Sequence, residues 1–411
     1  MKRRGFLTGA ALAGTSLSLD CGASGADARG DDKVMLGDDV LLAGAWSEIG
    51  NRCVGIVTNQ TGVTSRHGSV VDELQRKSRV CIRALFAPEH GLRGDRPAGA
   101  YVASYTDPAS KLPVYSLYGA TRRPSAEMLS GIDILLFDIQ DVGARAYTFI
   151  STMAYVMQAA AQHGKEVWIL DRPNPIGGTI VEGPVLEPEY KSFIGLYPIA
   201  MRHGMTVGEL AQMFNDAFGI HAKLRVIPMR GWQRSMLWDA TGLPWIQSSP
   251  NIPSWRTALL YPCTGLVASA GLNNATGTPR PFQYAGAYGL DAQRFAAAMN
   301  ARNLSGVSFQ GVVWVPASGF WAGKQLTGVA LGVYDPRAFL AVRTAVELLV
   351  TARDIAPRVI SIQSRTGIDR DWGTDTLRAG LLAGKSADEI VAEWAPRLDE
   401  FKRLREKYLL Y

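Results

Sequence analysis

The 411-residue sequence lacks the marks of several common classes of protein. It contains no G-x-S-x-G elbow, Walker motif, H-E-x-x-H helix or dinucleotide fingerprint, which excludes the best-marked serine hydrolases, NTPases, zincins and dehydrogenases. Beyond the N-terminus, no apolar run is long enough to span a bilayer. We therefore expect no cofactor and, once an N-terminal leader is removed, no stable membrane insertion.

Cysteine is also scarce, with four in the whole chain. Cys53, Cys81 and Cys263 lie beyond the leader, and their odd number and wide spacing argue against a disulfide framework or a zinc site. Cys53 and Cys81 fall in or beside predicted strands, where buried free thiols are common. We expect free thiols, although an oxidising compartment would allow one bridge that nothing in the sequence selects.

The chain has no block of like charges after residue 4. Its net charge of +6 and pI near 9.1 come from residues spread along the sequence, and no nucleic-acid motif is present. We therefore predict no nucleic-acid partner, while a mild positive charge also suits an anionic polymer such as cell wall. A hydrophobic content of 47% predicts a sizeable core, and the length favours two domains. Nothing in the sequence indicates an oligomeric state.

The first 28 residues have the pattern of an export signal. A basic start at residues 2–4 precedes a mild apolar stretch at 10–19 and an A-x-A site at 26–28. Adjacent arginines followed by Phe6 and Leu7 are typical of the twin-arginine type. The sequence therefore predicts an exported protein, periplasmic or extracellular.

Four short apolar runs end in polar clusters, and this is the most informative pattern in the chain. Apolar runs between helical stretches are typical of buried parallel strands, and ligands bind beyond the carboxyl ends of such strands. The pattern predicts one polar cleft in which carboxylates dominate. The clusters are Asn59-Gln60-Thr61-Gly62, Pro88-Glu89-His90-Gly91, Asp138-Ile139-Gln140-Asp141 and Asp171-Arg172-Pro173-Asn174.

The same alternation of strands and helices predicts an α/β fold with a doubly wound sheet over residues 45–255. Strands are expected near 52–58, 79–86, 132–138, 165–170 and 223–229, with helices near 147–163 and 206–218. Thr206 and Glu209 match a capping box at the start of the second helix. A proline-rich stretch at 243–262 reads as a connection to a smaller α+β domain at 260–411. Strands near 307–316 and 326–333 and helices near 336–352 and 386–404 are expected there.

Three carboxylates are candidates for catalysis. Glu89 follows an apolar strand and could act as a general acid, although pairing with an arginine or capping a helix would explain it equally simply. Asp138 and Asp141 lie three residues apart and could share the cleft with Glu89. Two carboxylates are the usual equipment of glycoside hydrolysis, and they could also bind a divalent cation, though the chemistry needs no metal. A salt bridge between Asp141 and Arg145 is the structural alternative.

Further polar residues near the strand ends are candidates for binding a substrate. Arg145 and Tyr147 could hold a carboxylate or hydroxyl. His203 lies just before a predicted helix cap, although a lone histidine is more often structural. The candidate substrate-binding residues are Asn59, Gln60, His90, Arg145, Tyr147, Asp171, Asn174, Glu182, His203 and Asn251.

Long stretches of the sequence resemble one family, the bacterial exo-β-N-acetylmuramidases of the NamZ type. The resemblance implies a Rossmann-like N-terminal domain, a smaller C-terminal domain, and a cleft between them. It also implies release of N-acetylmuramic acid from peptidoglycan fragments, and it places Glu89 where the catalytic acid is expected. The stretches are GIVTNQTGV (55–63), LFAPEHGLRGD (85–95), LFDIQDVGARAYTFISTM (136–153), LDRPNPIGG (170–178), EGPVL (182–186), RHGMTVGELAQMFN (202–215), GLPW (242–245) and SPNIP (249–253).

The sequence departs from the family pattern after residue 261. A motif like EGTN-x-S-x-GRGT-x-x-PF is expected there, but the chain has Ala268 for the glutamate, Gly271 for the asparagine and Thr276 for the arginine. Arg280 could replace the arginine. We therefore expect an exported exo-glycosidase that releases N-acetylmuramic acid or a related amino sugar. The alternatives are a catalytically weak sugar-binding or wall-sensing paralogue, and an esterase or amidase acting on wall fragments.

Overall fold

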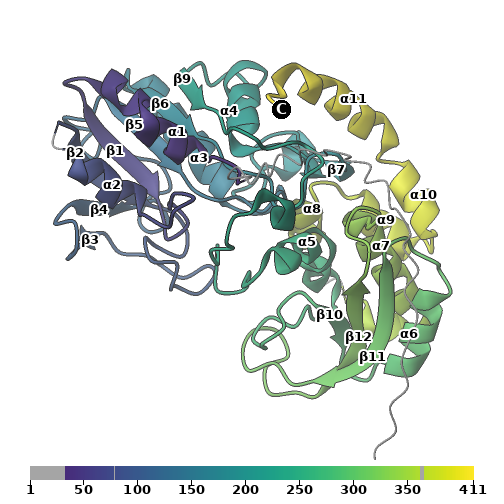
Figure 1. The fold of residues 1–411 in the computed structure, drawn as a ribbon. Coiled ribbons are helices and arrows are strands. Elements are labelled where there is room, and N and C mark those ends of the chain that lie inside the picture. The colour runs from purple at the N-terminus through teal and green to yellow at the C-terminus, as the bar shows by residue number, and fades with distance from the viewer. Residues whose placement is uncertain (1–32, 78, 362–364) are drawn as a thin grey trace, which may run out of the picture. The chain divides into compact units, whose positions relative to one another are not determined.

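The computed structural model describes residues 33–77, 79–361 and 365–411, so the predicted export signal lies outside the described residues. A seven-stranded sheet in the order β3-β4-β2-β1-β5-β6-β9 dominates the N-terminal half (Figure 1). All neighbouring pairs are parallel except β3–β4 at one edge. The strands are β1 (Cys53–Thr58), β2 (Cys81–Ala87), β3 (Tyr105–Thr106), β4 (Pro113–Ser116), β5 (Ile134–Asp138), β6 (Glu166–Leu170) and β9 (Lys223–Ile227).

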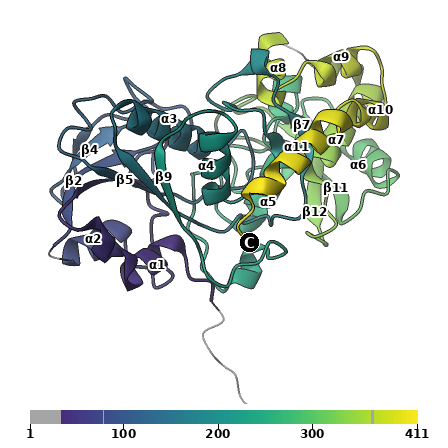
Figure 2. The ribbon, with the colours of Figure 1, turned by 90° about the horizontal axis from the view of Figure 1, so that it is seen from above.

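Helices cover both faces of this sheet, as the doubly wound prediction requires. In Figure 2, α1 (Gly37–Ala43) and α2 (Val70–Arg76) lie on one face, and α3 (Phe149–Gln162) and α4 (Val207–Asp216) lie on the other. Side chains alternate between the two faces along a strand, so Ile56 of β1 packs in one core and Val57 in the other. The capping box at α4 is confirmed, because Thr206 accepts from Glu209 N and Glu209 accepts from Thr206 N.

The C-terminal half contains a smaller antiparallel sheet in the order β10-β12-β11, with helices on one side of it (Figure 1). This confirms the α/β class with a smaller α+β part, while the domain boundaries stay a prediction. Its elements are α5 (Trp255–Thr264), β10 (Tyr284–Ala287), α6 (Ala292–Asn300), β11 (Val307–Trp314), β12 (Leu326–Val333), α7 (Ala341–Ile355), α8 (Arg365–Trp372), α9 (Thr376–Leu382), α10 (Ala387–Ala392) and α11 (Ala395–Arg405).

Short elements connect these parts. Two strands, β7 (Glu182–Val185) and β8 (Ala200–Arg202), pair antiparallel. The short 3-10 helices are η1 (Ala45–Ile49), η2 (Pro188–Tyr190), η3 (Trp238–Thr241), η4 (Val267–Ala270), η5 (Pro357–Val359) and η6 (Glu406–Tyr408). None of the helices in the described part of the chain is long and apolar enough to cross a membrane.

Two expectations about local structure were wrong. The proline-rich stretch, expected to be an irregular connection, contains α5, which starts at a cap where Ser254 accepts from Thr257 N. The helix expected over 386–404 is two helices, because Pro396 opens α11 in its first turn. Proline in these segments therefore marks helix starts and ends as well as loops.

The expectation that Cys53 and Cys81 are free thiols was also wrong, because they form a disulfide. They are register partners at the start of the neighbouring parallel strands β1 and β2, with Cα atoms 4.6 Å apart. Strand register is a tertiary property, so the 28-residue separation in sequence gave no hint of it. Cys263 is free and buried.

Candidate active site

The candidate site lies at the carboxyl ends of the parallel strands. Taken in chain order, the six parallel strands lie in the sequence 3-2-1-4-5-6 across the sheet, so the connections leave β1 in opposite directions. In sheets of this topology the ligand crevice opens where the order reverses, here between β1 and β5. Thr58 and Asp138 are register partners at this point, and Glu89 follows the adjacent strand β2.

Glu89 is a buried carboxylate whose two oxygens are held separately. It is 7% exposed; Oε1 accepts from Gly99 N at 2.8 Å and Oε2 accepts from Thr148 Oγ1 at 2.6 Å. Thr148 is the residue that precedes α3. Burial raises the pKa of Tyr118, and the neighbouring charge of Glu89 raises it further. The carboxyl group of Glu89 is therefore oriented by fixed donors and has a phenol beside it.

Two tyrosines lie close to Glu89. The rings of Tyr147 and Tyr261 meet edge to face with centroids 5.7 Å apart, and Tyr147 donates to Ser248 Oγ at 2.9 Å. Burial raises the pKa of both phenols, and the charges of Glu89 and Asp141 raise it further. Both hydroxyls therefore stay protonated at neutral pH and can donate hydrogen bonds among carboxylates.

A carboxylate that the sequence reasoning missed, Asp371, also lies near Tyr261. Its charge raises the pKa of Tyr261, and burial raises the pKa of Asp371 itself to about 6, with the Ser269 hydroxyl opposing that rise. Asp371 is half-buried near the end of α8, and the next residue is fixed because Arg145 Nη2 donates to the Trp372 carbonyl at 2.7 Å. No polar motif marks Asp371 in the sequence, so only tertiary structure reveals it.

Asp138, a predicted catalytic residue, belongs to a buried ion cluster. Its side chain is 0% exposed and Oδ1 accepts from Arg172 Nε at 2.6 Å, while Arg172 also donates to Asp38 at 2.8 Å. Burial raises the pKa of Asp138, and the charge of Arg172 opposes that rise. This geometry favours a structural role for Asp138 rather than contact with substrate.

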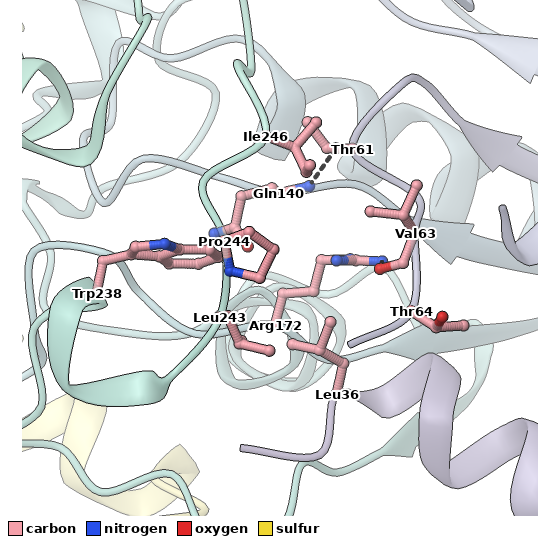
Figure 3. Close-up of a pocket in the computed structure, with 10 residues that line it drawn as sticks. All are labelled: Leu36, Thr61, Val63, Thr64, Gln140, Arg172, Trp238, Leu243, Pro244 and Ile246. Atoms are coloured by element: carbon pink, nitrogen blue, oxygen red, sulfur yellow. Dashed lines mark hydrogen bonds between the residues drawn. The ribbon is translucent and has the colours of Figure 1, made fainter. Parts of the chain in front are cut away.

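The pocket beside this cluster is too small for a sugar. It is lined by Arg172, Gln140 and Thr61 together with apolar side chains such as Trp238 and Leu243, and Gln140 N donates to Thr61 Oγ1 at 2.9 Å (Figure 3). Its volume of about 20 Å³ gives room for about one water molecule.

Asp141 faces His203 rather than Arg145. Asp141 Oδ2 accepts from Gly143 N at 2.7 Å and lies 3.5 Å from His203 Nε2. His203 Nδ1 accepts from Met205 N at 3.2 Å, so the proton of the neutral imidazole sits on Nε2 and points toward Asp141. Asp141 Oδ1 has no hydrogen-bond partner within the described residues. The pair is buried close to Tyr147, and one oxygen remains available.

Arg145 does not form the salt bridge with Asp141 that was the structural alternative, and its contacts do not favour substrate binding. The side chain is 1% exposed and donates to the carbonyls of Pro184 at 2.7 Å, Ile199 at 3.2 Å and Trp372 at 2.7 Å. Burial lowers the pKa of Arg145 to about 9. Its contacts tie β7 and the segment before β8 to α8.

Three more predicted substrate-binding residues, Asn174, Glu182 and Asp171, make hydrogen bonds within the fold. Asn174 donates to the Met205 carbonyl at 3.0 Å and accepts from Ile176 N at 3.2 Å. Glu182 accepts from the backbone N–H of Ala341 at 2.7 Å, and Arg202 lies 3.3 Å away. These side chains turn inward because the loops after β6 are closed by packing against α4 and α7, which the sequence does not show.

Of these three residues, Asp171 accepts the most hydrogen bonds. Its oxygens accept from Thr206 Oγ1 at 2.8 Å, Gly208 N at 2.7 Å, Tyr411 Oη at 2.8 Å and Arg172 N at 2.9 Å. Burial raises its pKa to about 6 despite these donors. Asp171 therefore anchors the start of α4 and the chain's final residue.

The remaining candidates lie nearer to open space. Asn59 Nδ2 has no partner within the described residues, and Gln60 donates to the Gln247 carbonyl at 2.8 Å. Both line a cavity of about 230 Å³ with Arg93 and Asp107.

His90 and Asn251 complete the predicted set. The His90 ring contacts the Arg96 carbonyl through Nδ1 at 2.7 Å, and His90 is buried. Asn251 is half-buried in the segment whose carbonyls bind Gln60. Within the described part of the chain, no group of three or more His, Cys, Asp or Glu side chains is arranged to hold a metal ion.

The segment that departs from the family pattern is well packed. Ala268 is exposed in η4, next to Ser269 at Asp371. Gly271 has φ +103°, and a Cβ there would lie 2.5 Å from the Val359 carbonyl oxygen. Thr276 donates to Asn274 Oδ1 at 3.0 Å. Gly271 therefore permits a close backbone approach that no larger residue allows.

A doubly wound sheet whose carboxyl edge places Glu89 and Asp141 near Tyr147 and Tyr261, with Asp371 of α8 near Tyr261, defines an α/β protein with a carboxylate site of the kind used in glycoside hydrolysis. The chain belongs to the exo-β-N-acetylmuramidase NamZ family. The family's N-terminal domain matches residues 54–256 and its C-terminal domain matches residues 259–411.

Similar proteins cover nearly the whole chain. The peptidoglycan β-N-acetylmuramidase NamZ of Bacillus subtilis (strain 168) is 40% identical over 410 residues, which is 99% of this chain and 98% of that protein. Two crystal structures of DUF1343 family proteins from Bacteroides fragilis also match. One is 35% identical with a TM-score of 0.87 and covers 93% of this chain and 100% of its own. The other is 30% identical with a TM-score of 0.75 and covers 92% and 99%.

Proposed function

We infer that this protein is an exo-acting glycoside hydrolase that releases N-acetylmuramic acid from the non-reducing ends of peptidoglycan fragments. Membership of the exo-β-N-acetylmuramidase family and the 40% identity to the Bacillus enzyme support this reaction. The observation that carries it is Glu89, a buried carboxyl group fixed by Thr148 and Gly99 beside buried phenols.

Glu89 acts as the general acid in the proposed mechanism. Its proton passes to the glycosidic oxygen as the bond from that oxygen to the anomeric carbon breaks. Tyr261, which stays protonated, donates a hydrogen bond to the sugar, and Tyr147 is held beside it by its own donation to Ser248. Because the donors to Glu89 come from the protein backbone and a helix start, the carboxyl group needs no rearrangement when substrate arrives.

Asp371 supplies the second carboxylate. In its ionised form it takes a proton from the water whose oxygen bonds to the anomeric carbon. Its partial exposure and a pKa near 6 suit a base that works near neutral pH. Asp141 competes for this role, because it lies near Tyr147 and its Oδ1 has no hydrogen-bond partner among the described residues, whereas Asp138 is fully buried in its ion pair with Arg172. Asp371 also lies beside Ala268, where the family pattern has a glutamate.

The protein acts outside the cytoplasm in this proposal. The basic start, apolar stretch and A-x-A site of residues 1–28 support export. The Cys53–Cys81 disulfide supports it independently, because disulfides persist mainly in oxidising compartments. Detection of the protein in a periplasmic or culture fraction, rather than the cytosol, tests this.

A catalytically weak sugar-binding paralogue is the second candidate, and the exposed Ala268 favours it. Incubation with a MurNAc-GlcNAc disaccharide and mass spectrometry of the products separates the two. Free N-acetylmuramic acid from the wild type and from Glu127→Gln, an exposed control, but not from Glu89→Gln, is the expected result. Intact disaccharide bound by all three proteins would favour the paralogue.

A further inference from the structure

A cluster of aromatic side chains lies in the loops that follow β10 and β11 of the C-terminal sheet. We call Tyr288, Phe320 and Trp321, with Lys324 above them, the aromatic platform. Tyr288 is 62% and Phe320 37% exposed. The Tyr288 and Trp321 rings stack with centroids 6.2 Å apart, and Phe320 lies 5.0 Å from Trp321. Large exposed aromatic groups of this kind mark binding surfaces more often than chance.

The loop that carries the platform is held in a strained conformation. Trp321 has φ +70°, in the left-handed region that bulky side chains rarely adopt. The loop is closed where Gly323 N donates to the Pro316 carbonyl at 2.8 Å, and Lys324 N donates to the Trp321 carbonyl at 3.0 Å. Trp321 Nε1 has no hydrogen-bond partner among the described residues. Strain that the surroundings maintain is a common sign of a functional position.

The platform is joined to the segment that departs from the family pattern. Asn273 Nδ2 donates to the Phe320 carbonyl at 2.7 Å, and Ala317 N donates to the Gly277 carbonyl at 2.9 Å. The same segment begins at η4, where Ser269 contacts Asp371. A chain of direct contacts therefore connects the platform to the carboxylate site.

The stretch of sequence that carries the platform has more cations than acids. Residues 265–334 contain Arg280, Arg294, Arg302 and Lys324, but Asp291 is the only acid. The ammonium of Lys324 lies over the Trp321 ring, 5.1 Å from its centroid. Within the described part of the chain, neither Lys324 nor Arg280 forms a salt bridge. The platform thus pairs flat apolar faces with free cations.

We propose that the aromatic platform binds the sugar rings of an anionic glycan strand beyond the disaccharide that occupies the carboxylate site. Apolar faces of pyranose rings stack on Trp321 and Tyr288, and Lys324 and Arg280 pair with carboxylates carried by the strand. The ligand class follows from the mixture of aromatic faces and unpaired cations. This inference rests on the proposed function for the identity of the strand as peptidoglycan glycan.

The test compares a short and a long substrate on the intact protein. The probes are the MurNAc-GlcNAc disaccharide and purified glycan strands of several disaccharide units. For Trp321→Ala we expect the KM for strands to rise about 10-fold, the effect of losing one aromatic contact, with kinetics on the disaccharide unchanged. Trp321→Gly relieves the positive φ and should show the same loss, whereas Trp321→Tyr should retain most of the affinity. Tyr334→Ala, 70% exposed outside the platform, is the matched control.

The role of Lys324 and Arg280 is tested by varying the salt concentration. Lys324→Gln combined with Arg280→Gln should weaken strand binding at low ionic strength and match the wild type near 0.5 M salt, where screening removes the attraction. An unchanged strand KM in Trp321→Ala, or an equal change on both substrates, would overturn the proposal. Direct binding of strands by sedimentation separates the two hypotheses. Loss of binding in Trp321→Ala without any cleavage by the wild type would retain the platform and reject the enzyme.

Discussion

Glu89 and Asp171 follow parallel strands of the same sheet, yet they end in opposite environments. Glu89 follows β2, receives one donor on each oxygen, and lies among Tyr118, Tyr147 and Tyr261. Asp171 follows β6 and receives four donors, one of them from the last residue of the chain. A strand end therefore places a carboxylate at the correct edge of the sheet, but the loops and helices that pack there decide whether substrate can reach it.

The largest expected effect separates these two carboxylates by activity. Glu89→Gln should lower kcat about 10²–10⁴-fold, the usual contribution of a general acid, and lower the free energy of unfolding by at most about 1 kcal/mol, because the Thr148 hydroxyl can turn to accept from the amide. Asp171→Asn should instead lower the free energy of unfolding by about 1–3 kcal/mol, because the amide presents a donor to groups that already donate. Steady-state kinetics and urea denaturation on both variants measure this.

Glu127→Gln, which removes an exposed carboxylate, is the control for both measurements. An Asp171→Asn variant that keeps wild-type stability but loses activity as strongly as Glu89→Gln would contradict the different roles assigned to these two carboxylates.

The second effect tests the buried ion cluster at the end of β5. Arg172→Leu leaves Asp138 and Asp38 buried without their cation, so we expect about 3–5 kcal/mol less stability. The triple change Asp38→Asn, Asp138→Asn, Arg172→Leu should recover part of that loss, because no uncompensated charge remains. Urea denaturation of the single and triple variants gives the difference.

Retained activity in the folded triple variant would confirm that Asp138 does not touch substrate. Loss of activity at recovered stability would return Asp138 to the catalytic site.

The sequence predicted the elements whose signals are local. Apolar β-branched runs marked β1, β2, β5, β6 and β9 within a few residues, and the spacing of Thr206 and Glu209 located the start of α4. Glu89 was identified as a candidate because it lies just after the end of such a run. Asp371 was missed since it becomes relevant only when α8 packs on η4, and the disulfide was missed since it depends on strand register.

The sequence also could not predict the direction in which the polar side chains at the strand ends point. Arg145, Asn174 and Glu182 stand in polar clusters like that of Glu89, but they bond to backbone groups of β7, α7 and α8 or of the loops beside them. A cluster at a strand end supplies donors and acceptors for closing the fold as readily as for binding a ligand. Only the packed structure distinguishes the two uses.

The third effect sharpens the comparison through pH. Activity that needs ionised Asp371 should fall about tenfold for each pH unit below its pKa of about 6. Asp371→Asn should lower kcat about 10²-fold and remove that acidic limb, and Asp371→Glu should restore part of the rate. Ser269→Ala removes a hydroxyl that lowers this pKa, so the limb should move to higher pH.

The matched variant Asp141→Asn decides between the two carboxylates. If Asp141→Asn abolishes the acidic limb and Asp371→Asn does not, Asp141 is the base.

The smallest expected effect concerns the hydrogen bond from Tyr411 to Asp171. Tyr411→Phe keeps the ring, which packs against Trp232 at 5.2 Å, but removes the hydroxyl that donates to Asp171 at 2.8 Å. We expect the free energy of unfolding to fall by about 1 kcal/mol, with kcat unchanged.

Burial raises the pKa of Asp171 from its ordinary value of 3.8 to about 6, so the folded state holds this proton more tightly than the unfolded chain. Its contribution to stability is therefore complete below pH 3.8 and declines as pH rises toward 6. Losing a donor to the carboxylate should extend that decline to higher pH in Tyr411→Phe, and urea denaturation at pH 4 and pH 7 measures it, with Tyr334→Phe as an exposed control. A variant that loses activity at both pH values while keeping wild-type stability would place Asp171 in the substrate site and remove the contrast with Glu89.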